Sequence, residues 1–176
     1  MTILQIIFII IFWGLICSFI SLAPWVPTKK SDLERIHKLL DLQKWQNFLE
    51  IWCGTAQVSL YVANKFPEAE VIGIELSPIL YVFSKIRVFF SGQKNISIIF
   101  WNALHLDFSK YDVLYVFGLP ETISQKLFPK LEHWLKEKAY LLSYCFQMKN
   151  NAFIEEKFKE KAEWNSIYKY SQKAKS

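Results

Sequence analysis

The chain has 176 residues, of which 52% are hydrophobic and 21% charged, and its formal net charge is +5. The apolar content excludes a disordered chain, and the length suits a single domain. None of the three cysteines stands at CxxC or metal-ligand spacing, which excludes a disulfide scaffold and a zinc module, and we expect no metal. Arginine, the residue that reads base edges, occurs only at Arg35 and Arg87, so the composition argues against a nucleic-acid partner.

The chain begins with a long apolar segment. Residues 3–22 carry no charge, and as a helix they would span roughly 30 Å, the thickness of a bilayer core. The alternative, a cleaved signal peptide, requires a positively charged n-region that is absent here. Lys29, Lys30 and Arg35 follow the segment, so the positive-inside rule places the rest of the chain in the cytoplasm. We therefore predict a transmembrane anchor over residues 1–23 and a single-pass location in the cell membrane.

A linker over residues 24–30, stiffened by two prolines, connects the anchor to a domain over residues 31–176. In this domain short apolar runs alternate with segments of helical periodicity. Such alternation predicts an α/β fold, a Rossmann-like and mostly parallel sheet with helices on both faces. Strands are expected at 47–52, 71–76, 96–101, 112–117, 139–146 and 164–170, with helices starting at Ser31 and spanning 58–66, 78–91, 121–136 and 151–161.

Three helical predictions carry more detail. Ser77 and Pro78 provide an N-cap and a first helical residue, and Gly92 ends the helix that they begin. Pro129 is expected to kink the helix over 121–136. The charged residues of 151–161 suggest a solvated helix face. The aromatic side chains that recur at helical spacing after Pro78 are expected to pack in the core, namely Tyr81, Phe83, Phe89 and Phe90.

Candidate binding residues follow three of the strands. In parallel sheets of this kind, ligands bind beyond the carboxyl ends of the strands. Glu50 ends the first strand and Glu75 the second, 25 positions later (75 − 50). A carboxylate ending the second strand suits a bidentate contact with ribose hydroxyls, so the spacing favours a nucleoside ligand. The candidate cofactor-binding residues are Glu50, Trp52, Gly54, Glu75, Asn102 and Ala103.

These residues resemble the S-adenosylmethionine site of class I, or seven-β-strand, methyltransferases. That site combines an acidic residue, a Gly-x-Gly-x-Gly turn, an acid ending the second strand and Asp or Asn after the third. In this sequence Trp52 and Ala56 replace two of the glycines. The resemblance implies S-adenosyl-L-methionine as cofactor and methyl transfer as the activity. The competing class, nicotinamide- or flavin-binding Rossmann proteins, requires Gly-x-Gly-x-x-Gly, which this turn does not contain.

Two flanking segments resemble one group of these enzymes more closely. They are Pro-Trp-Val-Pro-Thr at 24–28 and Phe-Gly-Leu-Pro at 117–120, after the fourth strand. The group is the membrane-anchored lysine methyltransferases, whose mitochondrial members modify the ADP/ATP carrier and the c subunit of ATP synthase. The resemblance implies a lysine of a membrane-associated protein as acceptor. We take Phe117, Gly118 and Pro120 as the lip that faces it.

No catalytic residue is assigned, because methyl transfer from a sulfonium depends on position and desolvation, and no Cys–His or His–Asp pair stands out. Two alternatives remain open at this point. The domain could be a catalytically inactive methyltransferase-like binding module, or a methyltransferase acting on a small molecule, a lipid or RNA.

Overall fold

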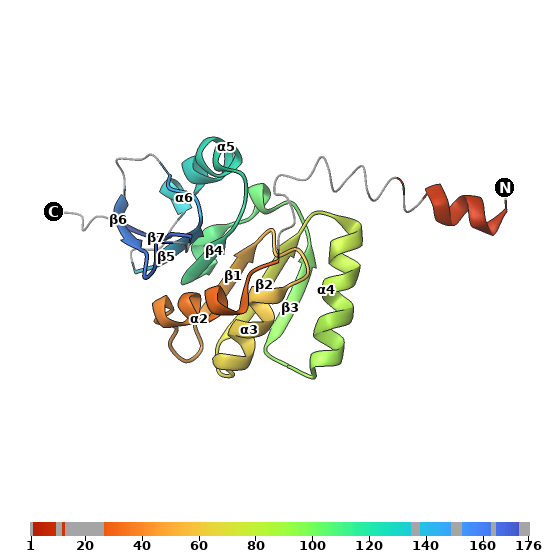
Figure 1. Cartoon of the computed structure of the whole chain (residues 1–176), viewed down its shortest axis with the longest axis horizontal. Helices are drawn as coiled ribbons and strands as arrows, with labels where there is room; N and C mark the ends of the chain where they lie inside the picture. The colour runs from red at the N-terminus through yellow and green to blue at the C-terminus, as the bar shows by residue number, and fades with distance from the viewer. Residues whose placement is uncertain are drawn as a thin grey trace.

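The molecule is built around one mixed sheet (Figure 1). The computed structural model describes residues 2–9, 12, 27–134, 138–148, 153–162 and 165–172. Residues 3–9 and 12 are helical, and the rest of the predicted anchor over 3–22 lies outside the described residues, as does the start of the linker. Among the residues described, no helix has both the length and the hydropathy needed to cross a bilayer.

The described strands form a seven-stranded sheet of order β3-β2-β1-β4-β5-β7-β6. The first five strands run parallel, and β7 runs antiparallel between β5 and β6. The predicted mostly parallel, Rossmann-like sheet is thereby confirmed. The strands are β1 (Asn47–Ile51), β2 (Glu70–Glu75), β3 (Ile96–Phe100), β4 (Val113–Val116), β5 (Tyr140–Tyr144), β6 (Phe153–Phe158) and β7 (Ile167–Gln172).

Helices cover both faces of the sheet, each over its own apolar cluster. One cluster contains buried side chains of α2 (Lys30–Leu39) and α3 (Gln57–Lys65), with α4 (Pro78–Ser91) packed against it through Tyr81 and Val88. The other contains side chains of η3 (Ile123–Leu127) and α6 (Phe128–Trp134). The shorter elements are α5 (Pro120–Thr122) and the 3₁₀ turns η1 (Ala103–His105) and η2 (Phe108–Lys110).

The helix predicted over 151–161 is wrong, because residues 153–158 form strand β6. All six residues of β6 pair with β7 in antiparallel register. β6 lies at the edge of the sheet, where charged side chains such as Glu156 and Lys157 face solvent and protect the exposed edge. The charge pattern is therefore that of an edge strand, and pairing with β7 overrides the helical propensity.

The N-terminal half of the helical segment after β4 contains a π-helical turn. η3 joins α5 to α6 and ends directly before Phe128, so the wider turn stands next to Pro129, where a kink was predicted. A proline removes one backbone donor and clashes with the preceding turn, and a π turn relieves this by changing the hydrogen-bond register.

Helix α4 begins and ends as predicted, after Ser77 and at Gly92, whose φ of 68° is the left-handed conformation that glycine adopts readily. The predicted burial of its phenylalanines is wrong. Phe83, Phe89 and Phe90 are 56%, 79% and 81% exposed, and only Tyr81 packs inward, with its ring 5.4 Å from that of Phe100. The reason is that α4 lies beside β3, the edge strand, so the sheet covers only one side of the helix.

Candidate cofactor and acceptor site

The turn after β1 has an unusual backbone. Trp52, Gly54 and Ala56 have φ values of 58°, 56° and 56°, so every second residue is left-handed. Glycine adopts this conformation readily, whereas other residues strain by about 1–2 kcal/mol each. The turn therefore has the backbone of a Gly-x-Gly-x-Gly motif, although two of its glycines are replaced. Gly54, which has no side chain, is buried between the two larger residues.

Glu75 connects this turn to the start of α4. One carboxylate oxygen accepts from the Gly54 N–H at 2.7 Å, and the other accepts from the N–H groups of Leu76 and Ser77 at 2.9 and 2.7 Å. The side chain is 3% exposed. Burial raises the pKa of Glu75, and the three N–H donors oppose that rise. The predicted contact with ribose hydroxyls stays a prediction, and the remaining acceptor capacity of the carboxylate leaves room for it.

Glu50 faces helix α3. Its Oε2 accepts from the backbone N–H of Ser59 at 2.7 Å and from the Ser59 hydroxyl, and both residues are buried. Desolvation raises the pKa of Glu50 to about 7, against the effect of the Ser59 hydrogen bonds. The charge of Glu75 adds to the rise, because the two carboxyl groups repel each other when both are ionised.

The remaining predicted cofactor residues lie at the same end of the sheet. The Asn102 side chain accepts from the Leu104 N–H at 3.0 Å and so caps η1, directly after β3. Ala103 is fully buried and shares an apolar cluster with Trp52. The Trp52 indole is largely buried, and among the described residues its Nε1 has no hydrogen-bond partner. A buried donor without a partner is rare, which points to a ligand acceptor at this position.

The predicted lip follows β4 and lies against the end of β5. The Phe117 ring is 5.2 Å from that of Tyr144, edge to face. It is also nearly parallel to the Phe146 ring, with the planes at 7° and the centroids 6.3 Å apart. Gly118 is buried, whereas Pro120 is exposed at the first residue of α5. The structure thus adds Tyr144 and Phe146, which the sequence analysis missed, to the predicted lip.

Two further contacts hold the turn after β1 from outside. Arg87 of α4 donates to the carbonyl and the hydroxyl oxygens of Thr55 at 2.7 and 3.0 Å. Gln57, at the start of α3, exchanges two hydrogen bonds with the backbone of Thr28, at 2.7 and 3.1 Å. The scarcity of arginine, with only two in the chain, was the one feature of the sequence that singled out Arg87. Nothing in the local sequence indicates the contact between Thr28 and Gln57, residues that lie 29 positions apart.

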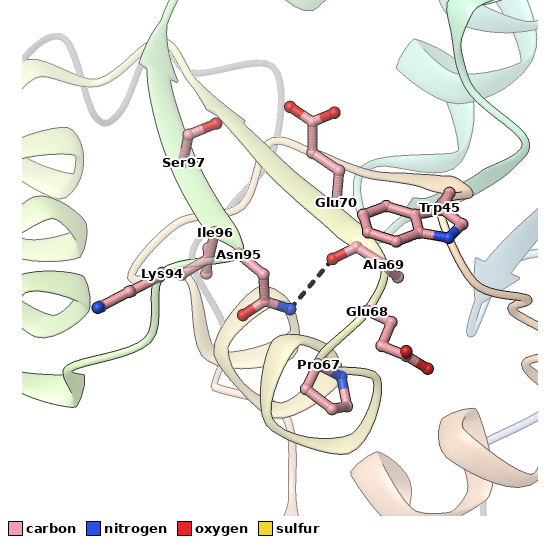
Figure 2. A pocket seen from close by; sticks show the side chains of 9 residues that line it. All are labelled: Trp45, Pro67, Glu68, Ala69, Glu70, Lys94, Asn95, Ile96 and Ser97. Carbon is pink, nitrogen blue, oxygen red and sulfur yellow. Dashed lines mark hydrogen bonds between the residues drawn. The ribbon is translucent and has the colours of Figure 1, made fainter.

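A separate hollow of about 470 Å³ lies at the opposite end of the strands (Figure 2). Its lining includes Trp45 and the first residues of β2 and β3. The Asn95 amide points inward there and donates to the carbonyl oxygen of Ala69 at 3.1 Å, as well as to those of Ala63 and Phe66. These bonds hold the turn between α3 and β2, so Asn95 has a structural role there. The hollow lies away from the site described above.

The strand order, the antiparallel β7, the left-handed turn after β1 and the acid ending β2 together define the class I methyltransferase fold. Residues 50–154 match the family described as the ANTKMT methyltransferase domain. This chain belongs to that family.

Several known proteins are similar to this chain. The RNA methyltransferase of Salinibacter ruber, solved with S-adenosyl-L-homocysteine, superposes with a TM-score of 0.76 over 86% of this chain and 96% of its own, at 21% identity. The demethylmenaquinone methyltransferase of Listeria monocytogenes is 34% identical over 86 residues, which are 47% of this chain and 36% of the relative. The probable ribosomal RNA small subunit methyltransferase A of Methanosarcina mazei is 31% identical over 118 residues, 66% of this chain and 42% of the relative. The chain thus matches less than half the length of these two relatives, and the superposition shows the fold.

Proposed function

We propose that this protein is a membrane-anchored enzyme that transfers a methyl group from S-adenosyl-L-methionine to a lysine of a membrane-associated protein. The observation that carries methyl transfer is the turn at 52–56, which has three left-handed residues and whose Gly54 N–H is held by Glu75 at the carboxyl end of the sheet. This turn keeps the backbone of the glycine motif although its sequence has diverged.

The charges around the turn suit a cationic cofactor. S-adenosylmethionine supplies a methyl group on a positively charged sulfonium sulfur, and its transfer to an amine leaves S-adenosylhomocysteine. Glu50 and Glu75 are both buried beside the turn, and burial raises the pKa of each. A positive ligand stabilises their ionised forms. The unpartnered Nε1 of Trp52 supplies a donor for a carboxylate, which the methionine end of the cofactor carries. The residues present therefore fit this cofactor.

The aromatic side chains after β4 and β5 support an amine acceptor. Phe117 and Phe146 present nearly parallel rings next to Tyr144, at the strand ends beside the cofactor residues. Aromatic faces attract cations and pack well on the methylene groups of a lysine side chain. A partly apolar surrounding also lowers the pKa of an amine, which favours the neutral form that attacks the methyl group.

The membrane part of the proposal is supported by the sequence of residues 3–22 and by the short linker that follows. Residues 24–30 extend to roughly 25 Å at most, so an anchored domain stays close to the bilayer on the cytoplasmic side. Confinement of this kind raises the effective concentration of acceptors near the headgroups.

The test supplies the purified full-length protein with radiolabelled S-adenosylmethionine and with membranes that contain their own proteins and RNA. The expected product is methyllysine in a membrane protein, recovered by hydrolysis and separated from methylated nucleosides. Glu75→Ala should lose this product, whereas Glu70→Ala, at the exposed start of the same strand, should retain it. Removal of residues 1–23 should reduce methylation of the same target at matched protein abundance.

A second candidate is RNA methylation, because relatives that match up to 66% of this chain are named as ribosomal RNA methyltransferases. An RNA base can also stack on the face of an aromatic ring. In the same assay this candidate predicts label in nucleosides and none in lysine. Cofactor binding without any transfer would instead identify an inactive binding module.

A further inference from the structure

The outer side of helix α4 carries a group of exposed apolar side chains that the proposed reaction does not use. They are Val82, Phe83, Ile86, Phe89 and Phe90, which we call the α4 stripe, with exposed fractions between 47% and 81%. Of the whole helix, only Ser84 is buried. Figure 1 shows α4 at the outer edge of the sheet, beside β3. A set of large apolar side chains gathered on one helix face marks a surface that contacts something other than water.

The arrangement around the helix is that of an amphipathic membrane-surface helix. At about 100° per residue, the α4 stripe is about 120° wide, and Lys85 and Arg87 stand beside its two borders. Both cations are exposed, and Arg87 donates to Thr55 through one of its guanidinium nitrogens only. Helices that lie in a membrane interface combine an apolar stripe of aromatic and aliphatic side chains with basic residues at its edges, whose long side chains reach the phosphates.

The charge of the surrounding segment matches an anionic surface. From Leu76 to Leu106, a stretch of 31 residues (106 − 76 + 1), there is no Asp or Glu, and Lys85, Arg87 and Lys94 are its cations. The same segment includes Ile99 of β3 and Trp101, which follows that strand, and both are exposed. Acidic lipids attract such juxtamembrane basic residues.

We propose that the α4 stripe lies on the surface of an anionic lipid bilayer, with the helix parallel to the membrane plane. A second copy of the chain fits this face poorly, because a two-fold contact through the stripe would bring Lys85 and Arg87 of both copies together with no acid of the segment to pair them. The inference rests on the membrane attachment in the proposed function and is independent of the acceptor and of methyl transfer.

This orientation fixes where the site lies. α4 begins two residues after Glu75, and Arg87 holds Thr55 in the turn after β1. A bilayer against α4 therefore contacts the helix whose Arg87 binds the cofactor turn. The carboxyl ends of β2 and β3, the strands next to α4, are kept close to the headgroup plane.

The test uses the full-length protein in vesicles of phosphatidylcholine and phosphatidylglycerol, at about 3:1, that contain a phospholipid with a photoreactive acyl chain. After irradiation, lipid adducts are located by peptide mass spectrometry, without S-adenosylmethionine or acceptor. Adducts within 78–101, in addition to those on 3–22, are the expected result. Their yield should fall about tenfold in Phe89→Ser/Phe90→Ser and should fall in vesicles of phosphatidylcholine alone.

The matched control is Trp45→Ser/Ile154→Ser, which removes two exposed apolar side chains elsewhere and should leave the adducts unchanged. Circular dichroism of each variant verifies folding, which exposed substitutions should preserve. Adducts confined to residues 3–22 would overturn the inference, as would protein–protein cross-links through α4 in place of lipid adducts. Either result leaves the methylation assay free to succeed, so the two proposals fail separately.

Discussion

Two groups of side chains of different chemistry lie at the carboxyl end of the sheet. One lies at the ends of β1 and β2, and the other at the ends of β4 and β5. At the first pair, Glu50 and Glu75 are buried and engaged with main-chain N–H groups, and the turn between β1 and α3 is held in a strained conformation. At the second pair, the side chains that meet are the rings of Phe117, Tyr144 and Phe146.

The difference separates two tasks. Carboxylates fixed by main-chain donors keep one geometry, which suits a cofactor that every turnover presents in the same form. Aromatic rings offer apolar faces that accept several groups, which suits an acceptor site that varies between relatives. Substitutions on the first side should therefore change stability and cofactor binding, and those on the second should change acceptor use.

The largest effect is expected from the charge of Glu50. Its pKa is raised to about 7 in the folded chain from an ordinary value of 4.5, so folding favours the protonated form. The stability that this gives is complete below pH 4.5 and is lost as the pH rises through 7. The raised pKa corresponds to about 3 kcal/mol. Relative to Glu50→Gln, which stays neutral, the parent should lose about this free energy of unfolding between pH 4.5 and 8.

Urea titrations of the full-length protein in mild detergent at several pH values measure this difference. Glu70→Gln is the control, since it makes the same substitution at an exposed position at the other end of β2. A constant difference between the parent and Glu50→Gln across the range would show that Glu50 titrates as an ordinary carboxyl group.

The next effect is on cofactor affinity. Glu75→Ala removes a carboxylate from three main-chain N–H groups and from the predicted ribose contact. Loss of hydrogen bonds to a charged partner should cost about 1.5–3 kcal/mol, or at least about tenfold in the dissociation constant of S-adenosylmethionine. Calorimetric titration measures it, and Glu70→Ala should bind like the parent. Equal binding by both variants would mean that the cofactor lies elsewhere.

A smaller effect is expected on the acceptor side. Phe117→Ala removes one of the paired rings, worth about 0.5–1.5 kcal/mol, so KM for the acceptor should rise by a factor of about 2 to 13. The dissociation constant of S-adenosylmethionine should stay the same, which separates the two sides. Phe66→Ala, another partly buried aromatic, packs against α2 through His37 and should leave both constants unchanged. If cofactor binding weakens with Phe117→Ala, the two sides are not separate.

Six of the seven strands were predictable, because apolar runs of strand length are local signals, and so is the position of an acid at a strand end. Glu50, Glu75 and Asn102 do lie at one end of the sheet. Local patterns failed where the outcome depends on neighbours distant in sequence. Strand β6 depends on pairing with β7, and the exposure of Phe89 follows from the edge position of β3.

The same limit explains the missed contacts of the site. Phe146 is adjacent to Phe117 only because β5 lies beside β4. Arg87 reaches Thr55 only because α4 passes the turn after β1. The two replaced glycines show a different limit, in which the sequence changes although the local backbone does not. A residue type is a weak signal for a left-handed backbone, and Trp52 and Ala56 adopt it although their side chains disfavour it.

The smallest effect tests that strain directly, at the one position where a glycine can be restored without removing a large side chain. Ala56→Gly loses the burial of one methyl group, about 0.8 kcal/mol, and gains relief of about 1–2 kcal/mol of left-handed strain, so the free energy of unfolding should rise by at most about 1 kcal/mol.

Ala63→Gly is the matched control, because Ala63 is equally buried in the same cluster but lies inside α3 in right-handed backbone. That variant should lose about 1–2 kcal/mol from helix propensity and the buried methyl group. The contrast between the two variants, measured by urea titration, isolates the strain of the turn. Equal destabilisation by both would mean that Ala56 occupies its left-handed conformation at no cost, and that the glycine motif is dispensable for the shape of the cofactor side.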